Sequence, residues 1–155
     1  MDKTELVSRI IELQQKADRA RRQFELDVWM NLSLTIAQVK SLFFIRNRGS
    51  TSSGKLASAL GVTPTNTTGI VDRLVKQGLV SREENPEDRR MLLLRPTEKG
   101  EELVAKLRAR RRDYMSEVLA RMNEDDLAAL FQGLNSLVKG AEAQEKETKN
   151  EHDET

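Results

Sequence analysis

A run of short polar residues, 63–68, carries the most informative chemistry in the chain. It reads Thr-Pro-Thr-Asn-Thr-Thr, and its position predicts the first turns of a helix. Asn66 can donate to and accept from adenine, and threonine side chains can contact phosphate or a thymine methyl. The free backbone N–H groups of a helix start also attract phosphate. Ordinary N-capping is the alternative, and it explains Thr63 better than the rest of the run. We predict that base or phosphate contacts come from Thr63, Thr65, Asn66, Thr67 and Thr68.

A second candidate element is the basic tip of a predicted hairpin, Asp88-Arg89-Arg90. Arginines on a protruding two-stranded wing can enter a narrow minor groove, whose negative potential favours them. Asp88 can hold one of these arginines in position. The alternative is a solvated turn with a weak ion pair, but next to a helix suited to a major groove we favour the groove interpretation. Phosphate contacts are also predicted for three other cations, Lys55, Arg73 and Arg82.

The charge distribution supports a polyanionic partner. The net charge of +1 conceals a net charge of +5 over residues 34–100, from eleven basic and six acidic side chains. A basic module indicates a polyanion, most commonly nucleic acid, although a solvated face is the alternative. Residues 141–155 hold two basic and six acidic side chains, a net charge of −4. This acidic tail lacks large apolar residues, which predicts a flexible segment.

The residue types that are rare or missing limit the chemistry further. There is no cysteine, which excludes disulfides, thiolate metal sites and thiol-based redox sensing. The single histidine, His152, lies in the tail, so we expect neither a histidine-based triad nor a zinc site. Acidic pairs such as Glu83–Glu84 have no accompanying nucleophile or phosphate-binding glycine loop. We therefore expect a protein that is not an enzyme and has no metal and no cofactor.

The hydropathy of the chain predicts a cytoplasmic protein. No apolar run approaches the roughly 20 residues that a membrane helix needs. Residues 1–10 carry charges throughout and do not resemble a signal peptide. A chain of 155 residues is long enough for one small domain with extensions.

The spacing of apolar residues predicts a mainly α-helical chain. Residues 4–30 form a long helix with one apolar stripe, which a second helix pair or a second subunit must cover. Thr35 and Gln38 make a capping box that begins the next helix, which ends ahead of Gly49. Residues 49–54 are predicted to be a turn, and within it Ser52 or Ser53 caps the third helix that follows.

The following segments predict a fourth helix, a small β-hairpin and two terminal helices. Thr63 and Pro64 begin the fourth helix, and the hairpin strands are predicted at 79–82 and 91–95. Thr97 caps a long helix, and Asn123 with Asp126 begins the last one. Two short helices joined by a glycine turn and followed by a hairpin make a winged helix-turn-helix. We divide the chain into an N-terminal helix (1–33), the winged module (34–100), C-terminal helices (101–140) and the acidic tail (141–155).

Between Leu34 and Gly100 the sequence resembles the MarR family, the multiple antibiotic resistance regulators. The match is in register over about 67 residues. Its most specific part is the wing motif followed by the start of the next helix. The segments that carry the resemblance are Lys55-Leu56-Ala57, Leu60-Gly61-Val62-Thr63, Val71-Asp72-Arg73-Leu74-Val75, Gly78-Leu79-Val80, Asp88-Arg89-Arg90 and Thr97-Glu98-Lys99-Gly100.

The resemblance implies a homodimeric transcription regulator, most often a repressor, that binds a pseudo-palindromic operator in double-stranded DNA. Residues 1–33 and 101–140 would then be dimerisation helices. Arg90 falls on the wing arginine that enters the minor groove, and Thr68 falls on a threonine of the recognition helix. Gly69 stands where many members carry a base-reading arginine. A general architectural DNA-binding protein and a winged-helix protein-interaction module are the alternatives.

Family members often bind a small aromatic ligand between the dimerisation helices and the winged module, which releases the DNA. A pocket of this kind would be lined by aromatic residues. The alternative, which we favour, is that the same residues belong to the core or to the dimer interface. The candidates are Phe24, Trp29, Phe43, Phe44 and Tyr114.

Overall fold

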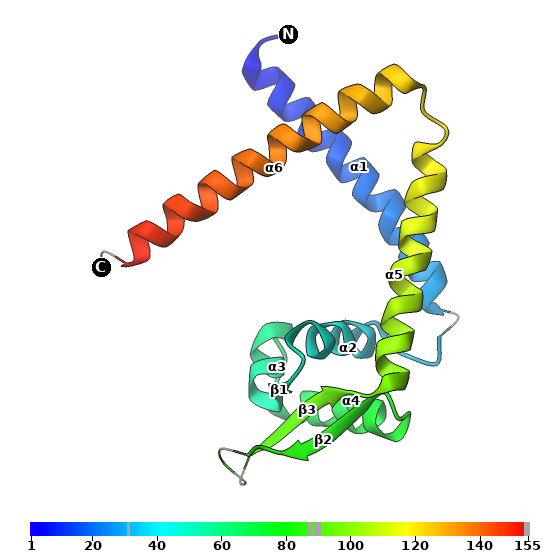
Figure 1. The fold of residues 1–155 in the computed structure, drawn as a ribbon, viewed down its shortest axis with the longest axis vertical. Coiled ribbons are helices and arrows are strands. Elements are labelled where there is room, and N and C mark those ends of the chain that lie inside the picture. The colour runs from blue at the N-terminus through cyan, green and yellow to red at the C-terminus, as the bar shows by residue number, and fades with distance from the viewer. Residues whose placement is uncertain (31, 87, 89–90, 154–155) are drawn as a thin grey trace. The chain divides into compact units, whose positions relative to one another are not determined.

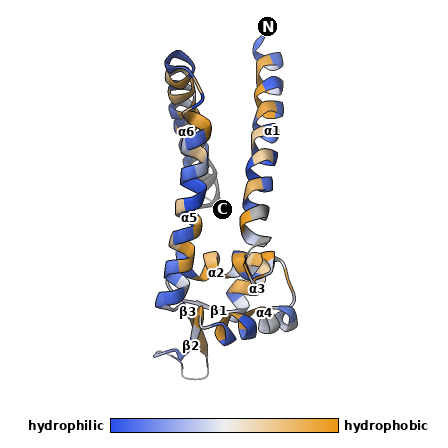
Figure 2. Cartoon of the chain, turned by 90° about the vertical axis from the view of Figure 1, so that its right-hand side faces the viewer, coloured by the Kyte–Doolittle hydropathy of each residue, from blue (hydrophilic) through white to orange (hydrophobic). Residues whose placement is uncertain are grey.

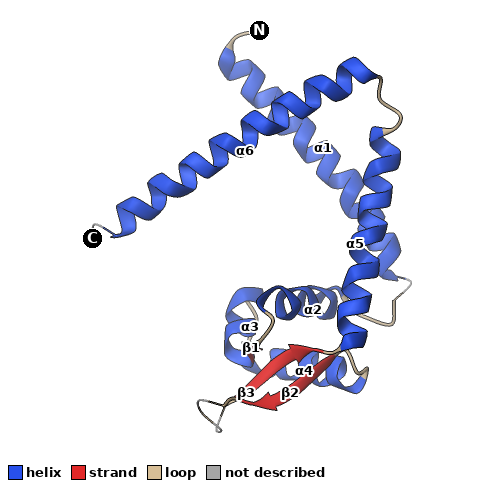
Figure 3. Cartoon of the chain, in the orientation of Figure 1, coloured by secondary structure: helices blue, strands red, loops and turns tan. Residues whose placement is uncertain are grey.

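Three helices and a three-stranded sheet make up the winged module (Figures 1 and 3). The computed structural model describes residues 1–30, 32–86, 88 and 91–153. Arg89 and Arg90 lie outside the described residues. The elements of the module are α2 (Ile36–Arg48), β1 (Thr51–Ser52), α3 (Ser53–Leu60), α4 (Pro64–Lys76), β2 (Val80–Glu84) and β3 (Leu92–Pro96).

The sheet is antiparallel, with β3 between β1 and β2. The predicted hairpin is confirmed, with strands shifted towards the C-terminus by one or two residues. The prediction that residues 49–54 form only a turn is wrong, because Thr51 pairs with Leu94 of β3 and is only 5% exposed. Two residues are too short for an alternating pattern, so only the pairing with a distant strand makes them a strand.

The predicted helix starts are confirmed by their capping hydrogen bonds. Thr35 and Gln38 form the full capping box of α2, and the side chain of Ser52 accepts from the backbone of Lys55 at the start of α3. Gly61 ends α3 in the left-handed conformation, with φ of 64°. A side chain at this φ is strained, so glycine is the favoured residue.

A single apolar core holds the winged module together. Helix α2 contributes Leu42 and Ile45, and α4 contributes Val71 and Leu74; all four are 0% exposed. Leu56 of α3 and Leu94 of β3 complete the centre of this core. Each element buries one apolar face in this core, and this packing sets the orientation of α4. The opposite face of α4 is left in solvent.

Two long helices belong to the same compact unit, Met1–Arg111, as the winged module. They are α1 (Lys3–Met30) and α5 (Glu98–Leu119), the latter leaving the unit after Arg111. Thr97 caps α5, since its hydroxyl accepts from Gly100 N at 3.1 Å and donates to Gly78 O at 2.6 Å. Val104 of α5 enters the core. In contrast, apolar residues recur along α1 (Figure 2), and those in its first half are exposed, Ile10 at 57%.

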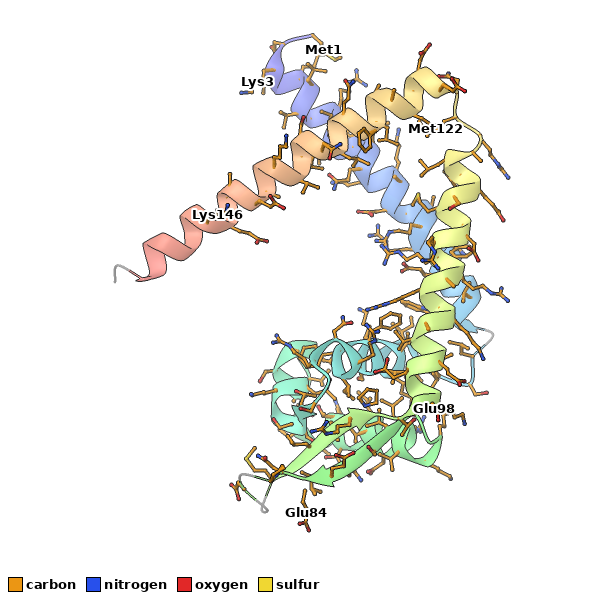
Figure 4. All side chains as sticks on the ribbon, in the orientation of Figure 1. Met1, Lys3, Glu84, Glu98, Met122 and Lys146 are labelled. Atoms are coloured by element: carbon orange, nitrogen blue, oxygen red, sulfur yellow. The ribbon has the colours of Figure 1, made fainter. Side chains whose placement is uncertain are left out.

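The second unit, Arg112–Thr155, contains the end of α5 and the helix α6 (Glu124–Asp153). Asn123 caps α6 as predicted, because its side chain accepts from Asp126 N at 2.8 Å. Met122 lies in the turn before this helix (Figure 4). The predicted end of the last helix near residue 140 is wrong, since α6 continues to Asp153. Alanine, glutamate, glutamine and lysine are strong helix formers, which favours this continuation. The flexibility of the acidic tail stays a prediction.

Candidate DNA-binding site

Helix α4 presents one buried and one polar face. Thr67, Val71 and Leu74 are 0% exposed and face the core. Solvent reaches the opposite side, which we call the exposed face of α4. This face is made by Thr65, Asn66, Thr68, Gly69, Asp72, Arg73 and Lys76.

The structure separates the predicted contact residues of the helix start. Thr63 is the N-cap, and its hydroxyl accepts from Asn66 N at 3.3 Å. Thr65, Asn66 and Thr68 lie on the exposed face, where their side chains can meet a partner. The prediction for Thr67 is wrong, because its buried hydroxyl donates to Thr63 O at 3.1 Å. Every third or fourth position of an amphipathic helix turns inward, and the small threonine fits that position.

The predicted cations around α4 occupy different settings. Lys55 is exposed in the first turn of α3. Arg73 lies on the exposed face of α4 and borders a hollow of about 380 Å³ between α4 and the start of α2. Asn66 and Gly69 line the same hollow. This arrangement places a cation, an amide and an uncovered helix surface side by side, which suits the backbone and base edges of a duplex.

Arg82 is held in an ion pair that the sequence prediction did not include. Its guanidinium contacts the carboxylate of Asp72 at 2.5 Å, which joins β2 to the exposed face of α4. Both side chains are partly exposed, so the pair contributes little to stability. Its electrostatic effect matters more, because it offsets the one acidic side chain on the exposed face of α4 and part of the charge of Arg82.

The described part of the hairpin tip is closed by backbone hydrogen bonds. Met91 N donates to Asp88 O, and Asn85 N donates to Met91 O, each at 2.9 Å. Glu84 at the end of β2 marks where the tip begins (Figure 4). The side chain of Asp88 is exposed. Minor-groove contacts by Arg89 and Arg90 stay a prediction, as does the role of Asp88 in positioning them.

A separate pocket of about 400 Å³ lies among α1, α2 and α5. Trp29 and Phe43 line it, as the ligand-pocket hypothesis expects. The other aromatic candidates lie elsewhere: Phe24 and Phe44 are not in its lining, and Tyr114 belongs to the second unit. Phe44 packs against the core and lies 5.6 Å from the guanidinium of Arg48. The core interpretation therefore holds for Phe44.

Four basic residues line this pocket and were missed by the sequence prediction, which considered only aromatic residues. They are Arg21, Lys40, Arg108 and Arg111. Glu25 contacts Arg21 at 2.7 Å and Arg111 at 3.6 Å. Burial lowers the pKa of Arg21, but the carboxylates of Glu25 and Asp18 outweigh it and raise that pKa overall. The three-residue spacing of Arg108 and Arg111 on one helix was the available signal.

Two features are absent from the described residues. None of their helices is long and apolar enough to cross a bilayer. No cluster of histidine, aspartate and glutamate among them could hold a metal ion.

A helix-turn-helix with a polar exposed helix and an adjacent β-hairpin defines the winged helix-turn-helix class of nucleic-acid-binding folds. The profile of the MarR family matches residues 34–92. The chain is 30% identical to the uncharacterised HTH-type transcriptional regulator YfiV of Bacillus subtilis over 119 residues, 77% of this chain and 74% of that one. It belongs to the MarR family and is a DNA-binding transcriptional regulator rather than an enzyme.

Two other transcriptional regulators are similar to the chain. The HTH-type transcriptional repressor MdtR of Bacillus subtilis is 28% identical over 114 residues, 74% of each chain. The crystal structure of the transcriptional regulator Tm0710 from Thermotoga maritima matches with a TM-score of 0.81 and 26% identity. That match covers 88% of this chain and 96% of Tm0710. The likeness therefore extends beyond the winged module to the long helices.

Proposed function

We propose that the protein is a homodimeric repressor that reads a pseudo-palindromic operator through α4. The observation that carries this proposal is the exposed face of α4, on which Thr65, Asn66 and Thr68 stand in solvent while the opposite face is fully buried. The core of the winged module holds α4 in place. Short polar side chains on α4 can therefore contact base edges without the helix first having to become ordered. The similarity to the repressor MdtR supports the direction of regulation.

The exposed apolar residues of the terminal helices support a dimer. On α1 they are Leu6, Val7, Ile10, Ile11 and Leu13, and on α6 they are Leu130, Phe131, Leu134, Leu137 and Val138. Stripes of this kind on long helices need a covering partner, and a second copy of the chain supplies matching surfaces. Two winged modules related by a two-fold axis would meet half-sites about 10 bp apart.

The proposal is tested by selecting bound fragments from genomic DNA with the purified chain and with Asn66→Ala. We expect the wild-type protein to select a two-fold symmetric sequence. Asn66→Ala should lose about ten-fold discrimination at one position of each half-site, because a bidentate amide–adenine contact is removed. Asn47→Ala is the matched control, because Asn47 lies on α2 and its side chain accepts from Arg108 at 2.7 Å, away from α4.

Each alternative predicts its own result in this selection. Uniform binding to all fragments would support the architectural protein, and failure to bind any fragment in dilute buffer would support the interaction module. If Asn66→Ala selects the same DNA sequence motif as the wild-type protein, Asn66 does not read bases.

We further propose that the pocket among α1, α2 and α5 holds an effector with an aromatic ring and an anionic group. Trp29 and Phe43 offer ring surfaces. Among the described lining residues, Lys40 and Arg108 are the cations without an ion pair. Because α2 and α5 both reach the core that positions α4, a ligand that prefers one arrangement of these helices would shift the DNA-binding equilibrium.

Benzoate, the simplest aromatic carboxylate, is a suitable probe for this pocket. We expect its addition to weaken binding of the selected DNA, and Lys40→Ala to need about ten-fold more benzoate for the same effect, since one charge-assisted contact is worth about 1.5–3 kcal/mol. Fluorescence anisotropy of labelled DNA measures both. If DNA affinity does not change with benzoate, the proposal of an aromatic effector is contradicted. The proposal that the protein is a DNA-binding repressor is unaffected.

A further inference from the structure

Gly69 occupies a position where nothing within the described chain requires a glycine. It lies in the interior of α4 and does not adopt a positive φ, unlike Gly49, Gly61 and Gly78. A Cβ built on Gly69 would meet no described atom within 4 Å, so close packing does not exclude a side chain either. Glycine in a helix interior is less favourable than alanine. The helix therefore carries a destabilising residue without an internal reason.

The position of Gly69 around the helix axis is informative. At 3.6 residues per turn, it lies about 160° from Thr67 and about 160° from Val71, the buried residues on either side of it in sequence. Gly69 is therefore at the centre of the exposed face of α4. At this point of the face, no side chain of position 69 covers the backbone.

The residues that precede Gly69 by one turn on the exposed face of α4 have short side chains. Thr65 and Asn66 precede it by one turn, and both are short. Arg73 follows by one turn and borders, with Asn66 and Gly69, the hollow of about 380 Å³. Short polar side chains reach base edges only if the helix backbone lies deep in the major groove. A glycine at the centre of the face permits that depth.

We propose that Gly69 is a specificity-determining residue, at which the backbone of α4 makes its closest approach to the floor of the major groove. This inference rests on the proposed function of α4 as the recognition helix. A methyl group at position 69 would hold the helix away from the bases. The contacts of Thr65 and Asn66 would then lengthen together, whereas contacts from flexible arginines and lysines to phosphates would adapt.

The test is Gly69→Ala, measured for thermal unfolding and for binding to two duplexes. One duplex is the sequence selected by the wild-type protein, and the other is a shuffled duplex of the same length and composition. We expect a melting temperature about 2–4 °C higher, because alanine favours the helix. We expect at least ten-fold weaker binding to the selected duplex and little change on the shuffled one.

Gly140→Ala is the matched control, because Gly140 is also exposed within a helix and has open space around its Cβ position. It should raise stability without changing the preference for the selected duplex over the shuffled one, because it lies outside α4. If Gly69→Ala binds the selected duplex as tightly as the wild type, the inference about Gly69 is overturned and the proposed function stands. If the wild-type protein itself selects no duplex, the proposed function fails first, so the two failures are distinguishable.

Discussion

Replacing Gly100 with alanine is expected to lower the free energy of unfolding by about 3 kcal/mol, a large effect for one methyl group. A Cβ at this position would lie 2.1 Å from the carbonyl oxygen of Leu79 and 3.3 Å from Cδ1 of Leu42. The Leu79 carbonyl cannot move away easily, because it accepts from Thr97 N at 3.1 Å in the turn that begins α5. The added methyl must therefore push α5 away from the start of β2 and from the core.

Urea denaturation of both proteins at the same concentration measures this effect, since the proposed dimer would unfold in a concentration-dependent way. Gly54→Ala is the matched control, because Gly54 lies in α3 with open space around its Cβ position, and this variant should be slightly more stable. A Gly100→Ala midpoint equal to that of the wild type would contradict the close approach of α5 to Leu79.

DNA affinity is expected to fall about 10³- to 10⁵-fold between 50 and 200 mM salt, as for a protein that neutralises about 6–10 phosphates. The cations that would do so in each subunit are Lys55, Arg73, Arg82, Arg89 and Arg90. Binding to phosphates releases condensed counterions, and added salt opposes that release. The charge of Arg82 is partly offset by Asp72. We therefore expect the loss of affinity to lie nearer about 10³-fold than 10⁵-fold.

Single variants measure how much each cation contributes to the salt dependence of DNA affinity. Lys55→Ala should make the slope of log affinity against log salt less steep by about two per dimer, one for each lost phosphate contact. Arg110→Ala provides the comparison, because Arg110 is also an exposed cation but lies on α5, away from the exposed face of α4. Affinities are measured by anisotropy over a series of salt concentrations. An equal change of slope in both variants would show that the site has no fixed phosphate contact at Lys55.

The helices and their starts could be predicted from the sequence because their signals are local. Thr35 with Gln38 and Thr63 with Pro64 act within one turn, so the sequence pattern alone predicts where α2 and α4 begin. The polar run at the start of α4 could likewise be identified as a candidate binding surface before its surroundings were known.

The contacts between distant segments could not be predicted in this way, because no local pattern encodes them. Only the packing of the core decides that Thr67 turns inward while Thr65 and Asn66 stay in solvent. The pairing of Thr51 with Leu94 and the ion pair of Arg82 with Asp72 each depend on the folded chain bringing two elements together. The sequence by itself determined the helices, their starts and the family, since these depend on short-range capping, periodicity and motif spacing. The tertiary structure decided which side of each element is buried and which is left in solvent, because burial depends on every other element of the core.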